Sequence, residues 1–542
     1  MLARLRSEDI VESAPRTEAA DAALLDEWRA SGVRFVSSSE RQQSRYDQAV
    51  RELLSCIRPA GTSGPILHEG GIYAGCWLES TGTISAELLS RFLPSVAERT
   101  FLAFADSQRD DGLFPYKLTD DGPVFSQIQL VSPPARSVWT HYRLHGNDHV
   151  FLERMYGALA RYDDWLARWR NTRQTGAVEA FCAYDTGHDL SPRFWHVPDS
   201  PHRNDPVRHD PANPILPFIA PDLTAAVACG REYLAAMAAD LGESDSDWHK
   251  KAFASERALF RQCWDDEDGF FYDRDSEDRF VRVQSDVLLR VVAAEIGSRE
   301  FFDGILERYL LNTRKFFAKY PFTSIALDDP RYDPGYDYNS WAGPSNFLSL
   351  IRAPHAFEHH GRHVELTWAM QPTLAALFRG TRFPQTLHPH TGREGFTETY
   401  SPAILCMLDF VERLCGIMPR TDGTLWFTCL TPAQIEHRDQ VHETGYARTV
   451  DGRAFELVNT EQGSIAYRDG KVLFEAPRGV RVVTDRRGEL RSLIGMVAHG
   501  VDGVLRFGNT RIEFNAAANE RLCLEEGRLV SVDAPGLVPP TY

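Results

Sequence analysis

The sequence predicts a mainly α-helical protein that ends in a β-rich region, and three observations support this division. Apolar residues recur every three or four positions, as on one face of a helix, up to about residue 418. Long loops rich in Pro, Gly, Asp, His and aromatic residues interrupt this helical part. After about residue 420 the chain changes to short alternating segments separated by Asp-Gly and Arg-Gly turns, which is typical of β-sheet.

Residues 88–106 form the clearest helical segment, because Leu89, Phe92 and Val96 follow helical spacing. Eleven further segments share this pattern, and twelve helices suggest six helical hairpins. The predicted helices are 17–31, 41–57, 88–106, 132–145, 148–170, 222–241, 245–263, 284–297, 299–313, 341–359, 362–378 and 402–416.

The loops 172–221, 314–340 and 380–401 are longer than simple connections need, and such loops usually carry function. We predict a helical domain over residues 1–419, in which 1–60 is either the first hairpin or an N-terminal extension. Residues 420–542 are predicted to form a β-sandwich-like domain packed on the helices.

The composition excludes several classes of function. The 542 residues include 76 acidic and 59 basic side chains, a net charge of −17, which argues against nucleic acid as a partner. No apolar run is long enough for a bilayer and the first residues contain no secretory signal, so we expect no membrane partner. Nine cysteines without a Cys-x-x-Cys pair argue against disulfides and zinc knuckles. We therefore expect a cytoplasmic protein.

Two loops contain the side chains best suited to chemistry. Residues 184–195 combine two carboxyl groups, an imidazole, a guanidinium and aromatic rings, and residues 395–402 place a carboxylate between aromatic rings. A pair of separated carboxylates suits glycoside cleavage, in which one protonates the leaving oxygen and the other activates water or attacks carbon. Each loop taken alone is also consistent with a turn that has a capping Asp or a surface Glu.

Residues 187–194, Gly-His-Asp-Leu-Ser-Pro-Arg-Phe, resemble the Ser-Gly-X-Asp-X-Ser-Pro-Arg-Phe/Trp signature of trehalases, mannosylglycerate hydrolases and processing α-glucosidases. These are inverting glycoside hydrolases of families 37 and 63 with an (α/α)6 barrel, a toroid of six helical hairpins. The resemblance implies that Asp189 is the general acid. It also implies that Glu398, in Glu-Thr-Tyr-Ser-Pro, is the general base, which the family has in Glu-Asn-Tyr-Asn-Pro.

Further segments resemble this family between about residues 65 and 430. Residues 77–80 resemble its Trp-X-Asp-Ser/Thr segment with Glu79 in place of Asp, 108–115 its segment ending in Asp-Gly-Phe/Leu-Ile/Phe-Pro, and 338–344 its Tyr-Trp-Arg-Gly-Pro segment. Aromatic residues among these are candidates for stacking on sugars, or are core. The predicted substrate-binding residues are Tyr73, Trp77, Glu79, Gln108, Asp111, Gly112, His188, Arg193, Phe194, Tyr338, Trp341 and Tyr400.

The departures from the family pattern bear on the substrate. Ala342 replaces an Arg that would hold a hydroxyl or carboxylate in bidentate fashion, which argues against trehalose-like or glycerate-bearing substrates. Together with the negative net charge, this favours a neutral or cationic substrate. Arg193 has two interpretations, a positive group beside the acid or a salt bridge that orients the loop.

The sequence thus predicts a glycoside hydrolase that cleaves an α-glycosidic bond of a small saccharide or glycoside with inversion. We expect no cofactor, because protonation and water activation suffice. Two alternatives remain: an (α/α)6 carbohydrate enzyme that acts on a β-linked or deoxy sugar, and a catalytically silent sugar-binding protein.

One histidine cluster raises the question of a metal. His355, His359 and His363 are spaced four apart, as on one helical face, but Gly361 interrupts the helix between them. We therefore expect a solvated helix end and no metal site.

Overall fold

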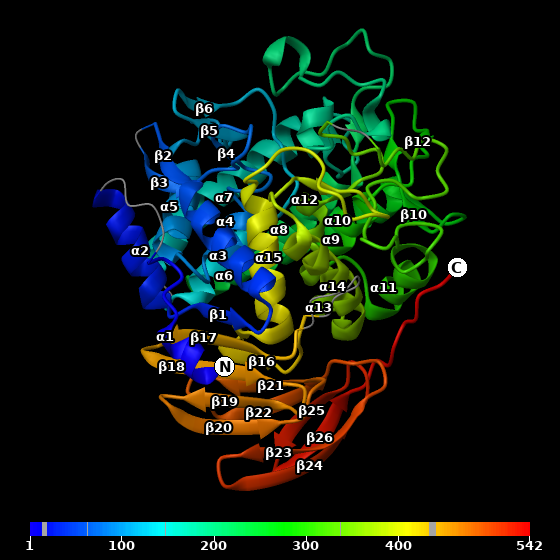
Figure 1. Ribbon diagram of the computed structural model, residues 1–542. Coiled ribbons are helices and arrows are strands. Elements are labelled where there is room, and N and C mark those ends of the chain that lie inside the picture. Colours follow the sequence, from blue (N-terminus) through cyan, green and yellow to red (C-terminus); the bar gives the residue numbers. More distant parts are fainter. Residues whose placement is uncertain (13–18, 62, 147, 336–337, 433–440) are drawn as a thin grey trace.

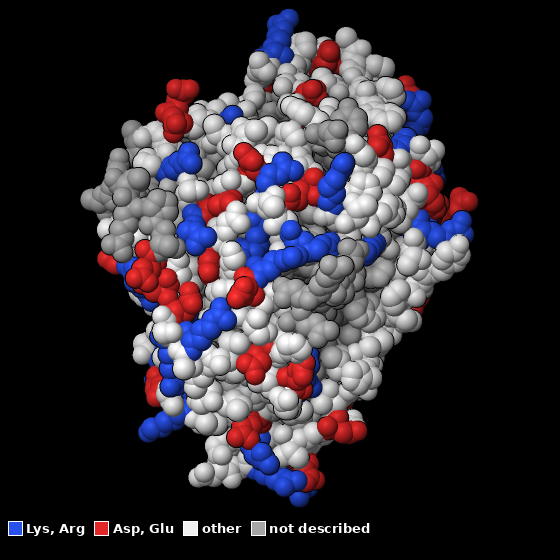
Figure 2. Space-filling model, viewed as in Figure 1, with Lys and Arg blue, Asp and Glu red and all other residues white. Residues whose placement is uncertain are grey.

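The computed structural model describes residues 1–542 except 13–18, 62, 147, 336–337 and 433–440. Helices fill the upper part of the view in Figure 1, and two layers of strands lie below them. None of the helices in the described ranges is long and apolar enough to cross a membrane. On the face in Figure 2, acidic and basic side chains are interspersed over both parts. On this face, the excess of negative charge is therefore not gathered into one patch.

Each predicted helical segment contains a helix, although residues 17 and 18 of the first lie outside the described residues. The α-helices are α1 (Leu2–Ser7), α2 (Ala19–Ser31), α3 (Glu40–Ser55), α4 (Ile84–Leu89), α5 (Pro94–Asp106), α6 (Pro134–Leu144), α7 (His149–Trp169), α8 (Pro221–Asp240), α9 (Ser246–Cys263), α10 (Val287–Val292), α11 (Arg299–Ile305), α12 (Phe347–Leu350), α13 (Ala353–His359), α14 (His363–Arg379) and α15 (Ser401–Cys415). Shorter turns are η1 (Ala183–Thr186), η2 (Pro192–Phe194), η3 (His202–Asn204) and the π-helical η4 (Leu306–Leu310).

Two predicted helices differ from the structure for identifiable reasons. The segment 88–106 is divided into α4 and α5, because Pro94 has no N–H for a preceding turn and instead occupies the first turn of α5. The segment 341–359 is helical only from Phe347, since Ser345 and Asn346 pair with Thr386 and Leu387 as a short two-stranded sheet.

The β-rich region contains two antiparallel sheets. One has the order β1-β17-β18-β19-β20-β23-β24 and the other β15-β16-β21-β22-β25-β26. The sheets face each other, since Phe427 of β16 contacts Phe455 of β18 and Phe474 of β20 at ring-centroid distances of 5.9 and 5.4 Å. Their strands are β1 (Arg34–Ser37), β15 (Ile417–Pro419), β16 (Thr424–Thr428), β17 (Thr444–Val450), β18 (Arg453–Asn459), β19 (Ser464–Arg468), β20 (Lys471–Ala476), β21 (Val480–Asp485), β22 (Leu490–Gly495), β23 (Val501–Phe507), β24 (Thr510–Ala516), β25 (Arg521–Glu525) and β26 (Arg528–Asp533).

Strand β1 comes from the N-terminal region and was not predicted. It pairs with β17 across more than four hundred residues, with Phe35 opposite Tyr446. The remaining strands are short and lie among the loops of the helical part. They are β2 (Ile57–Ala60), β3 (Ser63–Leu67), β4 (Cys76–Trp77), β5 (Lys117–Thr119), β6 (Gly122–Val124), β7 (Glu179–Ala180), β8 (Phe218–Ile219), β9 (Trp264–Asp265), β10 (Phe270–Phe271), β11 (Asp273–Arg274), β12 (Phe280–Val281), β13 (Ser345–Asn346) and β14 (Thr386–Leu387).

Helix α15 connects the loops to the sheets. Every residue from Ser401 to Cys415 is buried, and in Figure 1 the helix runs from the loops at the top towards the sheets below. Three of these residues are charged, and their charges are paired: Arg91 binds both Asp409 and Glu412, and Arg413 also binds Asp409. A helix of this length spans about 22 Å. It therefore holds the loop before Ser401 at a fixed distance above the sheets.

Candidate active site

Asp189 lies between η1 and η2, in a segment that includes η2 and most of η1 and that we call the Asp189 loop (residues 184–195). Its Oδ2 accepts a hydrogen bond of 2.8 Å from Nδ2 of Asn339, whereas its Oδ1 is buried and has no hydrogen-bond partner among the described residues. Burial and the charge of Asp199 raise the pKa of Asp189 to about 7, and Arg290 opposes this shift. The carboxyl group can therefore hold a proton at neutral pH.

The neighbouring His188 is fully buried and lies against Trp341, with ring centroids 4.5 Å apart. Its Nδ1 accepts a hydrogen bond of 2.6 Å from Nη1 of Arg193, and its Nε2 lies 3.2 Å from Oδ1 of Asp286. Burial and nearby guanidinium groups lower the pKa of His188 well below its usual value. A neutral imidazole with its proton on Nε2 fits both contacts, because a guanidinium can only donate.

Arg193 is part of the structure beneath the loop. Its guanidinium lies 3.1 Å from Asp222 and 2.7 Å from Asp273, and all three side chains are buried. Although burial acts to lower it, the two carboxylates raise the pKa of Arg193. The adjacent Phe194 is buried against Phe218, with ring centroids 5.9 Å apart. Of the two interpretations of Arg193, this geometry favours the salt bridge that orients the loop.

The carboxylate of Glu79 reaches the Asp189 loop because residue 187 is a glycine. A Cβ atom at Gly187 would lie 1.7 Å from Oε2 of Glu79, so a larger residue would displace this carboxylate. This Oε2 is buried and has no hydrogen-bond partner among the described residues. Burial, and then the charges of Asp189 and Glu69, raise the pKa of Glu79 well above its usual value. Glu79 and Asp189 thus share one site, in which the charge of Asp189 favours the neutral form of Glu79.

Arg290, on α10, is a further charged group at this site that the sequence analysis did not single out. It is 3% exposed, lies over the ring of Trp341 at 4.7 Å, and donates a hydrogen bond of 2.6 Å to the carbonyl of Thr186. Its Nε and Nη2 have no partner among the described residues. The sequence could have indicated Arg290, because it is a charged residue within the apolar run 287–294. Buried polar atoms without partners are rare, so several within one site indicate a position for a polar ligand.

Glu69 was also missed, because it precedes two glycines in a segment without periodicity. Its Oε1 accepts a hydrogen bond of 2.6 Å from the hydroxyl of Tyr400, and its Oε2 accepts bonds from Ser80 and, at 3.1 Å, from Thr81. Burial raises the pKa of Glu69 despite these donors. The ring of Tyr400 lies 5.9 Å from that of Tyr73, so the predicted aromatic residues of two distant segments meet here.

A row of aromatic contacts joins the Asp189 loop to the segment that carries Glu398. Phe396 contacts Tyr338 at a ring-centroid distance of 4.8 Å and Tyr73 at 6.5 Å. The residue after Tyr338 is Asn339, the hydrogen-bond donor to Asp189. Burial and the charge of Asp189 raise the pKa of Tyr73 well above its usual value, which places this phenol within the field of the carboxyl group. These ring contacts connect the segment that donates to Asp189 with Phe396, which lies two residues before Glu398.

Glu398 is exposed, in the segment that we call the Glu398 loop (residues 395–400). Thr397 and Thr399, on either side of it, have φ values of 59° and 49°, which β-branched residues rarely adopt. The loop packs on two glycines. A Cβ atom at Gly70 would lie 2.2 Å from the carbonyl oxygen of Thr399, and one at Gly71 would lie 2.4 Å from that of Glu398. Close backbone packing therefore holds this loop in a strained conformation.

Glu398 and Tyr73 line a cavity of about 850 Å³, together with Arg58, His68 and Asp120. His68 is 9% exposed, and its Nε2 is buried without a partner among the described residues. This volume is in the range of small-molecule sites. Glu398 is therefore accessible to solvent and lines the same cavity as the ring of Tyr73.

The predicted residues Gln108, Asp111 and Gly112 lie elsewhere, in a turn that packs on α7. Nε2 of Gln108 donates hydrogen bonds of 2.8 Å to the carbonyls of Gly112 and Ala158, and Asp111 accepts one of 3.1 Å from Trp165. These hydrogen bonds give the polar side chains of the turn partners within the protein, and none of them connects the turn with Asp189.

The predicted aromatic residues differ in exposure. Tyr338 is 56% exposed, whereas Trp341 is fully buried. Trp77 is partly buried, with its ring 5.6 Å from that of Tyr73 and the ammonium group of Lys117 at 4.7 Å from its centroid. Trp77, Tyr73 and Tyr338 are therefore available to a ligand, and Trp341 supports the site through His188.

His355, His359 and His363 do not point towards a common site. His355 lies 2.8 Å from Glu87, His359 lies 3.9 Å from Glu295, and His363 contacts Arg481 at 3.3 Å. The expected solvated helix end is wrong for His355 and His363, which are largely buried. Within the described residues, no group of three or more His, Cys, Asp or Glu side chains could hold a metal ion.

Residues 73–403 match the family model described as the mannosylglycerate hydrolase MGH1-like glycoside hydrolase domain. A search of curated protein sequences finds no match.

Solved structures resemble the chain in fold. A family 63 mannosylglycerate hydrolase from Thermus thermophilus is 19% identical, and the match covers 67% of this chain and 98% of that one with a TM-score of 0.57. A neutral trehalase from Saccharomyces cerevisiae is 12% identical over 64% of this chain and 73% of its own, with a TM-score of 0.50. A sialidase is 14% identical over 88% of this chain and 43% of its own, with a TM-score of 0.61. At these identities the likenesses show the fold alone.

Proposed function

This chain belongs to the mannosylglycerate hydrolase MGH1-like family and is a glycoside hydrolase, and we propose that it cleaves an α-glycosidic bond of a small saccharide or glycoside with inversion. Asp189 is the general acid and Glu398 the general base. The observation that carries the assignment of the acid is the state of Asp189: its pKa is raised to about 7, and its Oδ1 is buried without a partner.

The reaction needs two proton transfers at this site, one from Asp189 and one to Glu398. Oδ1 of Asp189 gives its proton to the glycosidic oxygen as the bond from that oxygen to the anomeric carbon breaks. Glu398 takes a proton from a water molecule, whose oxygen forms the new bond to the anomeric carbon. The hydrogen bond from Asn339 occupies Oδ2 of Asp189 and leaves Oδ1 to carry the proton. Inversion requires a separation of about 6.5–9.5 Å between the two carboxyl groups.

The polar groups around Asp189 support a proposal for the substrate. We infer that the free oxygen of Glu79 accepts hydrogen bonds from sugar hydroxyls, and that Nε and Nη2 of Arg290 donate hydrogen bonds to sugar oxygens. Ala342 offers no charge where the related family has Arg, so the proposed substrate is neutral or cationic. Tyr73, Trp77 and Tyr338 provide rings for sugar faces.

The arrangement of helices and strands also supports a proposal about the two domains. We propose that they form an (α/α)6 barrel over residues 1–419, which carries the catalytic groups, and that residues 420–542 form a supporting β-sandwich domain. The order of helices and the two facing sheets support this division.

Substrates with different leaving groups distinguish the role of Asp189 from that of Glu398. Asp189→Asn is expected to lower kcat on natural glycosides by about 10²–10⁴-fold but much less on a glycosyl fluoride, which needs no protonation. Glu398→Gln is expected to abolish turnover of both, because attack by water is lost. Anomer-resolved NMR of the first product checks inversion. An active double variant, or sugar binding by the native protein without turnover of any α- or β-glycoside in a panel, would contradict the proposal.

A further inference from the structure

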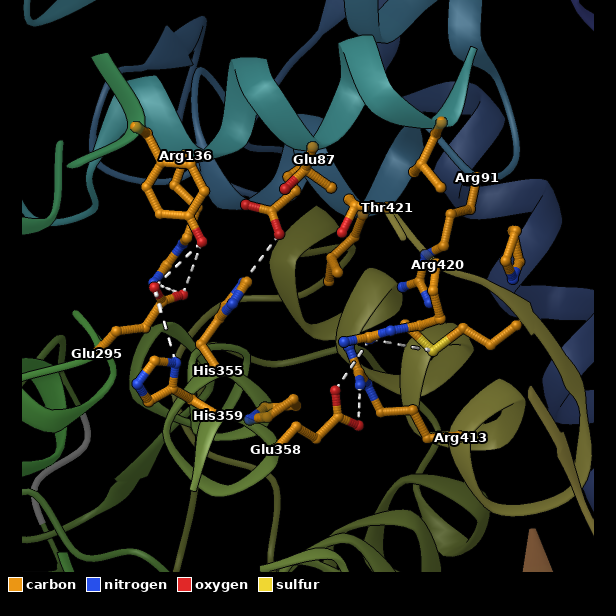
Figure 3. Close-up of a pocket in the computed structure, with 17 residues that line it drawn as sticks. Glu87, Arg91, Arg136, Glu295, His355, Glu358, His359, Arg413, Arg420 and Thr421 are labelled. Carbon is orange, nitrogen blue, oxygen red and sulfur yellow. Dashed lines mark hydrogen bonds and ion pairs between the residues drawn. The ribbon is translucent and has the colours of Figure 1, made fainter. Parts of the chain in front are cut away.

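A second cavity, of about 230 Å³, lies where the helical part meets the six-stranded sheet. Helices α4, α6, α8, α13 and α15 line it from one side and residues 418–421, around the end of β15, from the other. Figure 3 shows charged side chains converging on it from several helices. Four arginines and three glutamates line the cavity, and neither Asp189 nor Glu398 is among the lining residues.

The glutamates of this cavity are already satisfied. Glu87 accepts a hydrogen bond of 2.8 Å from Ser137 through Oε2, and its Oε1 lies 2.8 Å from His355. Both oxygens of Glu295 lie 3.1 Å from the hydroxyl of Tyr233, which can donate to one of them at a time; Oε1 also lies 3.5 Å from Nη1 of Arg136, and Oε2 lies 3.9 Å from Nδ1 of His359. Because these four oxygens all have protein partners, they leave little capacity to hold a cation.

The third glutamate, Glu358, is bound by two arginines. Its Oε1 accepts a hydrogen bond from Nη1 of Arg413, and its Oε2 accepts one of 3.0 Å from Nη1 of Arg420. These two charges lower the pKa of Glu358 despite its burial. Each arginine uses only part of its guanidinium in this contact, since a guanidinium carries five N–H donors.

One buried donor of the cavity has no protein partner. Arg136 is 1% exposed and donates a hydrogen bond of 2.6 Å to the carbonyl of Ala293, but its Nε has no partner among the described residues. Arg420 remains partly exposed, with 26% of its side chain accessible. The hydroxyls of Thr140 and Thr421 also line the space. Each of the four arginines that line the cavity is paired with a carboxylate. What the cavity offers an anion is therefore the N–H groups that these pairs leave unused, together with the two hydroxyl groups.

We propose that this cavity binds a small oxyanion, the carboxylate or phosphate group of a small metabolite. Guanidinium groups hold such groups through charge-assisted hydrogen bonds, and the volume suits a compact ligand better than an oligosaccharide. The site is separate from the proposed catalytic one. Helix α15 places Glu398 before its first residue, Ser401, whereas Arg413 near its other end lines the cavity.

Isothermal titration of the native protein with inorganic phosphate, and separately with lactate, tests the site. One of the two anions is expected to bind, and the tighter one identifies the group as phosphate or carboxylate. Arg420→Gln is expected to weaken its binding about tenfold, as loss of one charge-assisted hydrogen bond implies. Arg506→Gln, which removes an exposed arginine paired with Glu475 on the far sheet, is the matched control and is expected to bind as the native protein does.

Thr140→Trp provides a second variant, because it fills the cavity without removing a charge. It is expected to abolish the same binding. The proposal is overturned if neither anion binds the native protein, or if Arg420→Gln and Arg506→Gln bind equally well.

Discussion

The loops that carry Asp189 and Glu398 are held in place by different kinds of contact. Beneath the Asp189 loop, buried charges pair with one another, as Arg193 does with Asp222 and Asp273. The Glu398 loop has no such pair among its described contacts and is held by backbone packed against Gly70 and Gly71. An acid needs a dry site that raises its pKa, whereas a base that activates water needs access to it. The two modes of support match these two needs.

The largest effect is expected from the charges beneath the Asp189 loop. Arg193→Met leaves Asp273 buried without its cation and leaves Asp222 with Arg290 alone, at 3.4 Å, which costs about 3–5 kcal/mol in the free energy of unfolding. Urea unfolding of the variant beside Arg506→Gln measures it, since the control removes an exposed ion pair worth about 1 kcal/mol or less. Equal stabilities of the two variants would show that the buried network does not hold this loop.

A smaller effect, on catalysis and not on folding, is expected at the Glu398 loop. In Gly71→Ala the new Cβ would lie 2.4 Å from the carbonyl oxygen of Glu398, so the loop must move. A displacement of about 1 Å lowers kcat about a hundredfold.

Gly508→Ala is the matched control for this substitution. Gly508 has a φ of 55° against 58° for Gly71, but a Cβ there meets nothing within 4 Å. Both variants carry the same backbone strain, so only Gly71→Ala is expected to lose activity. Equal kcat values in the two variants would show that packing against Gly71 does not position Glu398 for catalysis.

The sequence was sufficient for elements with strong local patterns. Helical spacing predicts α7 and α14 to within a residue or two at each end, and a short motif points to Asp189. It was not sufficient for long-range pairing. Nothing near Phe35 indicates that it lies opposite Tyr446, because strand partners are chosen by the fold as a whole.

The same limit explains the residues missed at the candidate site. Arg290 occurs in an apolar helix and Glu69 in a glycine-rich segment, and neither position reveals which buried atoms will lack a partner. Conversely, Gln108 and Asp111 belong to a segment that resembles a known one, yet their side chains bind α7 and Trp165. A resemblance locates a segment, and only packing decides which of its side chains face a ligand.

The smallest effect is expected from removing the hydrogen bond between Asn339 and Asp189. In Asn339→Ala the Asp189 carboxylate loses the 2.8 Å hydrogen bond that stabilises its charged form, so its pKa is expected to rise from about 7. An acid acts only while protonated, and activity falls as the pH rises through this pKa. The basic limb of the kcat/KM profile is therefore expected to move to higher pH by about half a unit to one unit.

Asn515→Ala, which removes a similar amide contact to Asp502 on the exposed sheet, is the control for this shift. Its profile is expected to overlay that of the native enzyme. A basic limb that stays in place in Asn339→Ala would mean that a group other than Asp189 donates the proton. A limb that moves to lower pH would mean that Asn339 mainly supports the neutral acid, which would reverse the assignment of the two carboxyl oxygens.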